Sequence, residues 1–243
     1  MKRFLIALQF LTILPVKVKS KVEKNDFGAS LLYFPLVGFL IGLLLVLSAF
    51  ALSSFPSLLK AAIILIISII VTGGIHLDGF ADTCDGFYGN NPKEKILEIM
   101  RDSHIGTMGV AGVVSILLLK FSLIASFPEG PLWKTLLLMA VFSRWAQVMA
   151  CFGSSYARQE GKAKYFIEHA TKKEFFVGFL FTLALFCVFF KLKGLILFFA
   201  SLLFAFLFMQ YIKKRIGGMT GDTIGGLSEF TEVTVLLSAF FMV

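Results

Sequence analysis

The chain has 243 residues, of which 58% are hydrophobic and 16% are charged, and its formal net charge is +8. Its mean hydropathy is +0.88. A soluble domain carries about 25% charged residues, so this composition excludes an ordinary soluble fold and predicts a membrane protein. Basic residues in membrane proteins gather in cytoplasmic loops, so the positive charge does not indicate a nucleic-acid partner. The three cysteines match no metal or redox spacing.

Seven apolar stretches follow an N-terminal apolar segment that we expect to lie on the membrane as an uncleaved helix. Each is close to the roughly 20 residues that cross a bilayer. They predict an all-α fold, a polytopic helical bundle of about seven transmembrane helices that forms a single domain over 1–243. In chain order the predicted spans are 31–52, 57–75, 109–127, 132–152, 175–190, 194–212 and 224–243.

The distribution of basic residues predicts the orientation of these spans. The N-terminal segment and the loops at 76–108, 153–174 and 213–223 hold 17 Lys and Arg residues, whereas the alternate loops and the span ends that adjoin them hold 4. By the positive-inside rule the N-terminus is cytoplasmic. The loops at 76–108 and 213–223 are then expected on the same cytoplasmic face, where they form the active site.

An acidic segment follows the second span directly. If it is helical, Asp78, Asp82 and Asp85 stand at i, i+4 and i+7, which places three carboxylates on one stripe where they repel one another. Carboxylate clusters of this kind suit Mg²⁺, which binds through a few carboxylates plus substrate phosphates. The alternative is a solvated loop face, but these aspartates alternate with small and apolar residues. His76 is a candidate base, phosphate contact or structural hydrogen-bond donor.

Two further polar segments precede spans. Arg101 and Ser103 lie in the first, where they are candidates for phosphate binding, although a helix cap is an equal explanation for the hydroxyl. In the second, Thr220 and Gly221 belong to a glycine-rich turn whose backbone N–H groups can hold phosphate oxygens. Asp222 follows them as a candidate fourth metal ligand or base.

Four ionisable residues lie inside predicted spans and more than four residues from the span ends, where charge is costly and therefore indicates function. Glu229 stands seven residues after Asp222, and Arg144 is a candidate partner; both are candidates for substrate binding. Lys120 and Glu232 complete the group, and Lys120 is a second candidate partner unless it extends to the membrane surface.

The sequence GGIHLDGFADTCDG at 73–86 resembles the signature of the cobalamin synthase family, the adenosylcobinamide-GDP ribazoletransferases. The resemblance extends to PLVG at 35–38, MRDSHIGT at 100–107 and GGMTGDTIG at 217–225, in the same order along the chain. Three positions depart from the family pattern, namely Cys84, His104 and Gly226. The histidine removes a permanent cation from a candidate phosphate contact.

The resemblance implies transfer of the cobinamide phosphoryl group of adenosylcobinamide-GDP to α-ribazole or its 5′-phosphate, with release of GMP. It implies a Mg²⁺ cofactor and a multi-pass protein of the cell membrane, surrounded by lipids, with its active site facing the cytoplasm. On this interpretation Asp78, Asp82 and Asp85 hold the metal, Asp222 is a fourth ligand or a base, and His76 is a third catalytic candidate. The sequence leaves open whether the protein forms a homo-oligomer.

Two alternatives remain. Membrane CDP-alcohol phosphotransferases and intramembrane prenyltransferases also place aspartates at the cytoplasmic ends of helices, but the former space them differently. A transporter would place its ionisable residues near the bilayer midplane, whereas thirteen of the fifteen carboxylates here lie outside the spans, six of them in one loop.

Overall fold

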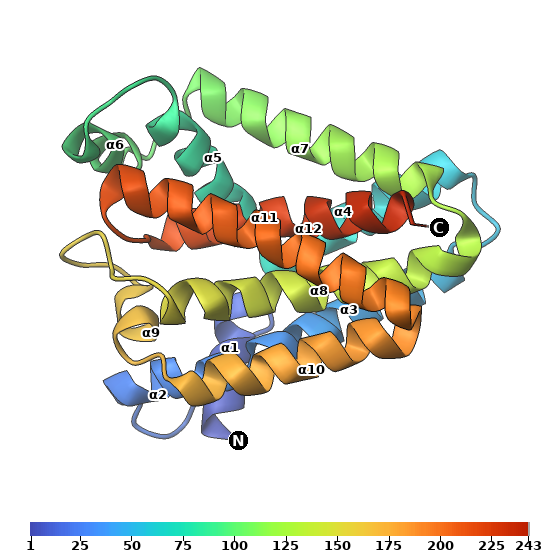
Figure 1. Cartoon of the computed structure of the whole chain (residues 1–243), viewed down its shortest axis with the longest axis horizontal. Helices are drawn as coiled ribbons and strands as arrows, with labels where there is room; N and C mark the ends of the chain where they lie inside the picture. The colour runs from blue at the N-terminus through green and yellow to red at the C-terminus, as the bar shows by residue number, and fades with distance from the viewer. Residues whose placement is uncertain (243) are drawn as a thin grey trace.

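The computed structural model describes residues 1–242, which form α-helices and one short 3-10 helix (Figure 1). Its seven long helices lie side by side and match the seven predicted apolar stretches, so the predicted all-α class and the positions of these helices are confirmed. They are α3 (Phe34–Ala51), α4 (Ser57–Thr72), α7 (Thr107–Ser126), α8 (Glu129–Phe152), α10 (Lys172–Phe190), α11 (Leu192–Ile216) and α12 (Gly221–Phe240).

Six shorter elements accompany them. Three precede α3, and the other three lie in the connections that follow α4, α5 and α8. They are α1 (Lys2–Leu11), α2 (Lys24–Ser30), η1 (Leu31–Tyr33), α5 (Ile75–Phe87), α6 (Lys93–Ile99) and α9 (Lys164–Glu168).

Apolar helices long enough to cross a membrane make the chain a multi-pass membrane protein. Five segments qualify by length and composition: the continuous segment Lys24–Ala51, which ends with α3, and the helices α7, α8, α10 and α11. The bent pair formed by α4 and α5 is a sixth. The helix α12 is not among them, since it carries Asp222, Glu229 and Glu232. The predicted number of seven spans and the predicted orientation stay predictions.

A sharp bend separates α4 from α5. Gly73 and Gly74 have φ angles of 62° and 67°, in the left-handed region that residues with a Cβ atom rarely adopt. The two helices therefore meet at 91°, and the acidic segment after the bend is helical, as the spacing of its aspartates required. The predicted second span, 57–75, extends three residues beyond the end of α4, because the left-handed glycines end the helix at Thr72.

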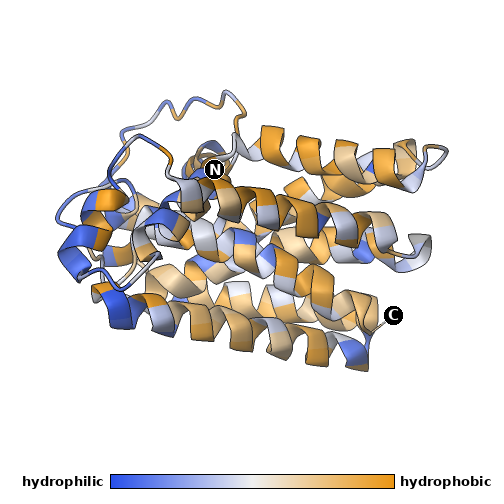
Figure 2. Ribbon diagram, turned by 90° about the horizontal axis from the view of Figure 1, so that it is seen from above, coloured by the Kyte–Doolittle hydropathy of each residue, from blue (hydrophilic) through white to orange (hydrophobic). Residues whose placement is uncertain are grey.

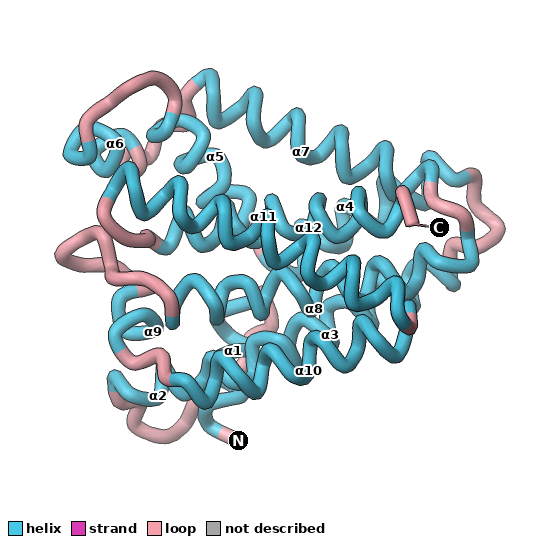
Figure 3. The backbone as a smooth tube through the Cα atoms, viewed as in Figure 1, coloured by secondary structure: helices cyan, strands magenta, loops and turns pink. Residues whose placement is uncertain are grey.

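The polar loops gather at one end of the bundle (Figure 2). The last turn of α11 joins these loops: Arg215 donates to the carbonyl oxygens of Gly89 and Asn91, both at 3.3 Å, and Lys213 donates to the carbonyl oxygen of Gly153 at 2.8 Å. The segments at 88–106, 153–163 and 217–220 therefore lie together at one end of the bundle (Figure 3). That the loops at 76–108 and 213–223 form an active site facing the cytoplasm stays a prediction.

The most polar long helix, α12, lies at the centre of the bundle, where it contacts α5, α7, α8 and α11. Its buried carboxylates are neutralised by cations from the surrounding helices. Lys120 of α7 donates to Glu229 at 2.6 Å and to Glu232 at 2.7 Å, and Arg144 of α8 donates to Glu232. We refer to Lys120, Arg144, Glu229 and Glu232 as the buried ionic network. It confirms the predicted pairing of these residues.

Glycines allow the closest approaches between helices. At Gly79 of α5, an added Cβ would lie 2.7 Å from the backbone oxygen of Asp222 and 2.8 Å from its Cα. One turn further along α12, Gly225 lies against the backbone of His76. Gly42 of α3 and Gly178 of α10 also allow close approaches, both against α8. The close contact between α5 and α12 therefore requires glycine, which has no side chain, at position 79.

We expect Lys120→Met to lower the free energy of unfolding by about 3–5 kcal/mol, because it leaves two buried carboxylates without their shared partner. Thermal unfolding in detergent micelles measures this. The matched control is Lys95→Met, which removes an exposed pair with Glu98 and should cost at most about 1 kcal/mol. Equal effects of the two substitutions would show that the buried ionic network does not stabilise the bundle.

Gly79→Ala should also destabilise the protein, by about 1–3 kcal/mol, because α5 and α12 must separate to accept the new methyl group. Gly130→Ala is the control, since an added Cβ there meets nothing within 4 Å. The same unfolding measurement applies to both. If Gly79→Ala unfolds at the temperature of the control, the two helices are not held at the distance that the structure shows.

Candidate active site

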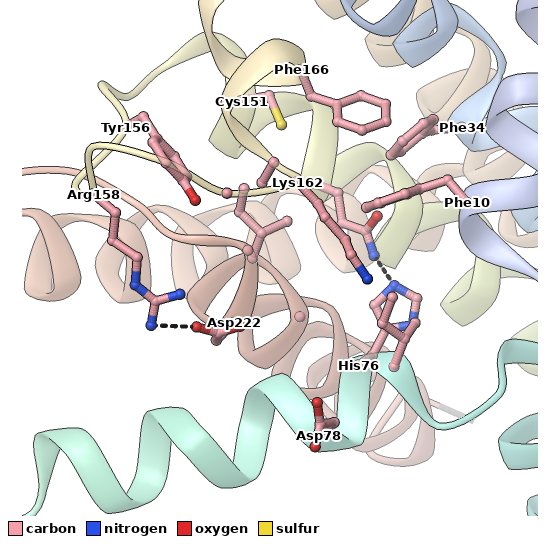
Figure 4. A pocket seen from close by; sticks show the side chains of 17 residues that line it. Phe10, Phe34, His76, Asp78, Cys151, Tyr156, Arg158, Lys162, Phe166 and Asp222 are labelled. Atoms are coloured by element: carbon pink, nitrogen blue, oxygen red, sulfur yellow. Dashed lines mark hydrogen bonds and ion pairs between the residues drawn. The ribbon is translucent and has the colours of Figure 1, made fainter. Parts of the chain in front are cut away.

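A cavity of about 310 Å³ lies at the polar end, between α5, α8, α12 and the loop at 153–163 (Figure 4). One side is aromatic, and its three rings pack on one another with centroids 4.6 to 6.0 Å apart. The opposite side carries charges of both signs. The aromatic side is formed by Phe10, Phe34 and Phe166, and the charged side by Asp78, Arg158, Lys162 and Asp222.

Two distant parts of the chain supply the carboxylates. Asp78 lies in the first turn of α5 and Asp222 in the first turn of α12, and both line the cavity. Asp82, one turn further along α5, does not line it, but its carboxylate is subject to the negative charges of Asp222 and Asp78. The close approach at Gly79 brings these three groups together. Their mutual repulsion favours a bound cation.

The arrangement fits a hydrated Mg²⁺ ion better than an all-protein metal site. Within residues 1–242, no three His, Cys, Asp or Glu side chains are close enough to enclose a metal by themselves. Mg²⁺ does not need such a group, because it keeps several waters and binds through one or two carboxylates plus substrate phosphates. Asp78, Asp82 and Asp222 offer oxygen donors of the required chemistry beside an open cavity.

Asp85, the remaining predicted metal ligand, has a different environment. Its carboxylate oxygens accept hydrogen bonds from the backbone N–H groups of Gly106 and Gly109, both at 2.7 Å. These donors belong to the start of α7, where a helix leaves its first N–H groups without intrahelical partners. Asp85 therefore fixes α7 to α5, and we do not retain it in the ligand set.

The loop at 153–163 contributes two cations to the cavity. In the sequence, its basic residues had served only to predict the orientation of the spans. Arg158 forms an ion pair with Asp222 at 2.7 Å, and Lys162 extends into the cavity (Figure 4). Tyr156 lines the same wall, and burial raises the pKa of its phenol, while Arg158 acts in the opposite direction. The only signal in the sequence was a basic loop on the same predicted face as the aspartates.

His76 lies between the cavity and the bundle core and is 5% exposed. Its Nε2 atom is 2.6 Å from the side-chain amide nitrogen of Gln147 on α8. Because the amide N–H donates, Nε2 is an acceptor in this contact. Nε2 is therefore engaged as an acceptor, which differs from the structural hydrogen-bond donor that the sequence suggested. The Nδ1 atom is buried without a hydrogen-bond partner within the protein, and a catalytic role for His76 stays a prediction.

The predicted substrate-binding residues do not form one group in the structure. Arg144 and Glu229 belong to the buried ionic network and do not line the cavity, so we replace their predicted role with a structural one. Thr220 is buried and caps α12 by accepting a hydrogen bond from the Thr223 N–H at 3.2 Å. Gly221, the first residue of that helix, does line the cavity.

Arg101 and Ser103 are exposed on the loop between α6 and α7. Neither lines the cavity, although the charge of Arg101 acts on Tyr156. The structure therefore places both residues at the polar end, on the rim outside the cavity, and their role in substrate binding stays a prediction.

Comparison with known proteins gives matches over nearly the whole chain. The relative from Alkaliphilus metalliredigens is 40% identical over 238 residues, covering 98% of this chain and 94% of its own length. The relative from Clostridium acetobutylicum is 35% identical over 241 residues, covering 98% and 96%. The relative from Acetivibrio thermocellus is 36% identical over 244 residues, covering 100% and 98%. All three are named adenosylcobinamide-GDP ribazoletransferase.

No solved structure matches this chain. The family model described as cobalamin-5-phosphate synthase matches residues 3–240, which include α5, the start of α12 and the loop that carries Arg158. The resemblance stated from the signature at 73–86 is thereby confirmed: the chain belongs to the cobalamin-5-phosphate synthase family.

Proposed function

We propose that this protein transfers the cobinamide phosphoryl group of adenosylcobinamide-GDP to a hydroxyl of α-ribazole or α-ribazole 5′-phosphate and releases GMP, which completes the assembly of cobalamin. One observation carries the proposal: carboxylates from α5 and α12 meet two cations in a single cavity. A nucleotide-activated diphosphate needs both, because its oxygens bind cations directly and bind carboxylates through a metal ion.

Asp78, Asp82 and Asp222 would hold Mg²⁺ on the substrate diphosphate. When bound, the ion neutralises negative charge on the phosphoryl oxygens and on the departing GMP. Asp78 and Asp222 stand on different helices at the cavity wall. They therefore fix the position of the diphosphate relative to both α5 and α12.

The other residues of the cavity bind and orient the substrates. Arg158 and Lys162 are positioned to contact phosphoryl oxygens, and the N-terminus of α12 at Gly221 adds backbone N–H groups and a favourable helix dipole. The rings of Phe34 and Phe166 provide an apolar surface for a flat heterocycle. In the reaction, the ribazole oxygen forms a bond to phosphorus, the bond to the GMP oxygen breaks, and the hydroxyl proton leaves to a carboxylate or to water.

Positioning and charge neutralisation supply most of the rate in phosphoryl transfer. Burial raises the pKa of the Asp222 carboxyl, and the Arg158 guanidinium acts in the opposite direction. Asp222 is therefore a candidate for both roles, ligand of the metal ion and base for the attacking hydroxyl. The polar end would face the cytoplasm, in agreement with its excess of basic residues, and the surrounding helices would lie in the cell membrane.

We expect Asp82→Asn to reduce the rate of cobalamin formation by more than the roughly 10–100-fold that is typical when only a partner of a metal ligand is lost. The measurement uses purified protein in lipid, over a Mg²⁺ titration. Asp102→Asn is the control, since Asp102 is exposed and interacts with His104. Wild-type rates for Asp82→Asn at every Mg²⁺ concentration would disprove the metal assignment.

Substrate choice tests the proposed reaction itself. The protein should release GMP from adenosylcobinamide-GDP when α-ribazole is present, and it should release no CMP from a CDP-alcohol. Chromatography of the released nucleotide measures both. Chelation of Mg²⁺ with EDTA should stop GMP release, and added Mg²⁺ should restore it. Release of CMP without GMP would instead assign the protein to the CDP-alcohol class.

A further inference from the structure

The ion pair between Arg158 and Asp222 occupies a carboxylate that the proposed reaction needs for its metal ion. The Arg158 Nη2 atom lies 2.7 Å from the Asp222 Oδ2 atom, and the two side chains are 11% and 23% exposed. A guanidinium and a hydrated divalent cation repel each other and interact with the same negative group. One carboxylate therefore binds the two cations together less strongly than it binds either one alone.

The backbone holds this guanidinium close to α12. Ala157 donates to the carbonyl oxygen of Met219 at 2.9 Å, and Met219 donates to the carbonyl oxygen of Ser155 at 2.9 Å. The residue that carries the cation is thereby anchored to the residues that precede Asp222. The same Nη2 atom that pairs with Asp222 also donates to the carbonyl oxygen of Met100 at 3.1 Å. An exchange of partners therefore has to replace this neutral contact as well as the ion pair.

Arg158 also has an unused donor. Its Nε atom is buried and has no hydrogen-bond partner within the protein, which is unusual for a buried polar group. A guanidinium that donates through Nε and one terminal nitrogen binds two oxygens of a phosphate side by side. The second donor is therefore free for a ligand, and the cavity beside it is the only space that Arg158 lines among the cavities described in residues 1–242.

We propose that Arg158 is an exchangeable counter-ion. It neutralises Asp222 while the site holds no metal, and it transfers to the diphosphate of the substrate when a divalent cation binds Asp222. This inference rests on the proposed function for the identity of the diphosphate. Arg158 then has two opposite effects: it weakens the binding of the divalent cation to Asp222, and it strengthens the binding of the phosphate.

The test measures the two effects separately and without turnover. Titration calorimetry of protein in detergent gives the affinity for Mn²⁺ alone, and a second titration at saturating Mn²⁺ gives the affinity for pyrophosphate. For Arg158→Gln we expect Mn²⁺ to bind about 5-fold more tightly, at the low end of typical coupling between sites. Pyrophosphate should bind at least about 5-fold more weakly, because the variant loses a charge-assisted contact.

Lys162→Gln is the matched control, since Lys162 lines the same cavity and no ion pair joins it to Asp222. It should weaken pyrophosphate binding and change the Mn²⁺ affinity much less than Arg158→Gln does. Arg158→Lys retains the charge but not the fork of donors, and it should lower the pyrophosphate affinity with little change for Mn²⁺. If Arg158→Gln fails to fold, this second variant still tests the proposal, because an unchanged pyrophosphate affinity in Arg158→Lys overturns it.

The proposal is overturned if Arg158→Gln binds Mn²⁺ no more tightly than the wild type, or if pyrophosphate affinity is unchanged. A purely structural role for Arg158 predicts that both affinities fall together with the unfolding temperature, which also overturns it. The two affinities are measured without the corrinoid substrate. Opposite changes in them would therefore support the exchange even if the protein failed to form cobalamin.

Discussion

The active site depends on the close approach of α5 and α12 at Gly79. The backbone of Asp222 occupies the space that any side chain at position 79 would fill. This contact brings Asp78 and Asp82 of α5 close to Asp222 of α12 at the charged side of the cavity, although the two helices come from different halves of the chain. A helix pair with larger residues at the contact would be separated further, and a hydrated cation could not bridge the carboxylates.

The buried ionic network has a second effect beyond neutralising charge. Glu229 lies seven residues after Asp222, and seven residues are close to two full turns of an α-helix. The pairing of Glu229 and Glu232 with Lys120 and Arg144 therefore fixes the rotation of α12 about its own axis. That rotation determines where the Asp222 carboxylate points. Charges in the core and carboxylates in the cavity are thus parts of one arrangement.

Apolar length and helical spacing were enough to predict the seven long helices and the carboxylate stripe on α5, since both features are local in the sequence. The pairing of Asp85 with the start of α7 was not predictable, because it joins groups 2.7 Å apart whose separation depends on the path of the loop between them. Arg158 was missed for the same reason. Its importance comes from the distance to Asp222, and nothing in its own segment distinguishes it from the neighbouring lysines.

The balance of charge explains why an arginine stands beside a metal-binding aspartate. Asp78, Asp82 and Asp222 bring three carboxylates to the cavity region, and Arg158 and Lys162 bring two cations. The carboxylates offset the attraction of these cations for a diphosphate. A divalent cation adds positive charge and makes the site attractive to the substrate. Because Arg158 pairs with Asp222 in the unliganded site, burying this carboxylate costs less free energy than burying it unpaired. The arginine also lies beside the cavity that the diphosphate would enter.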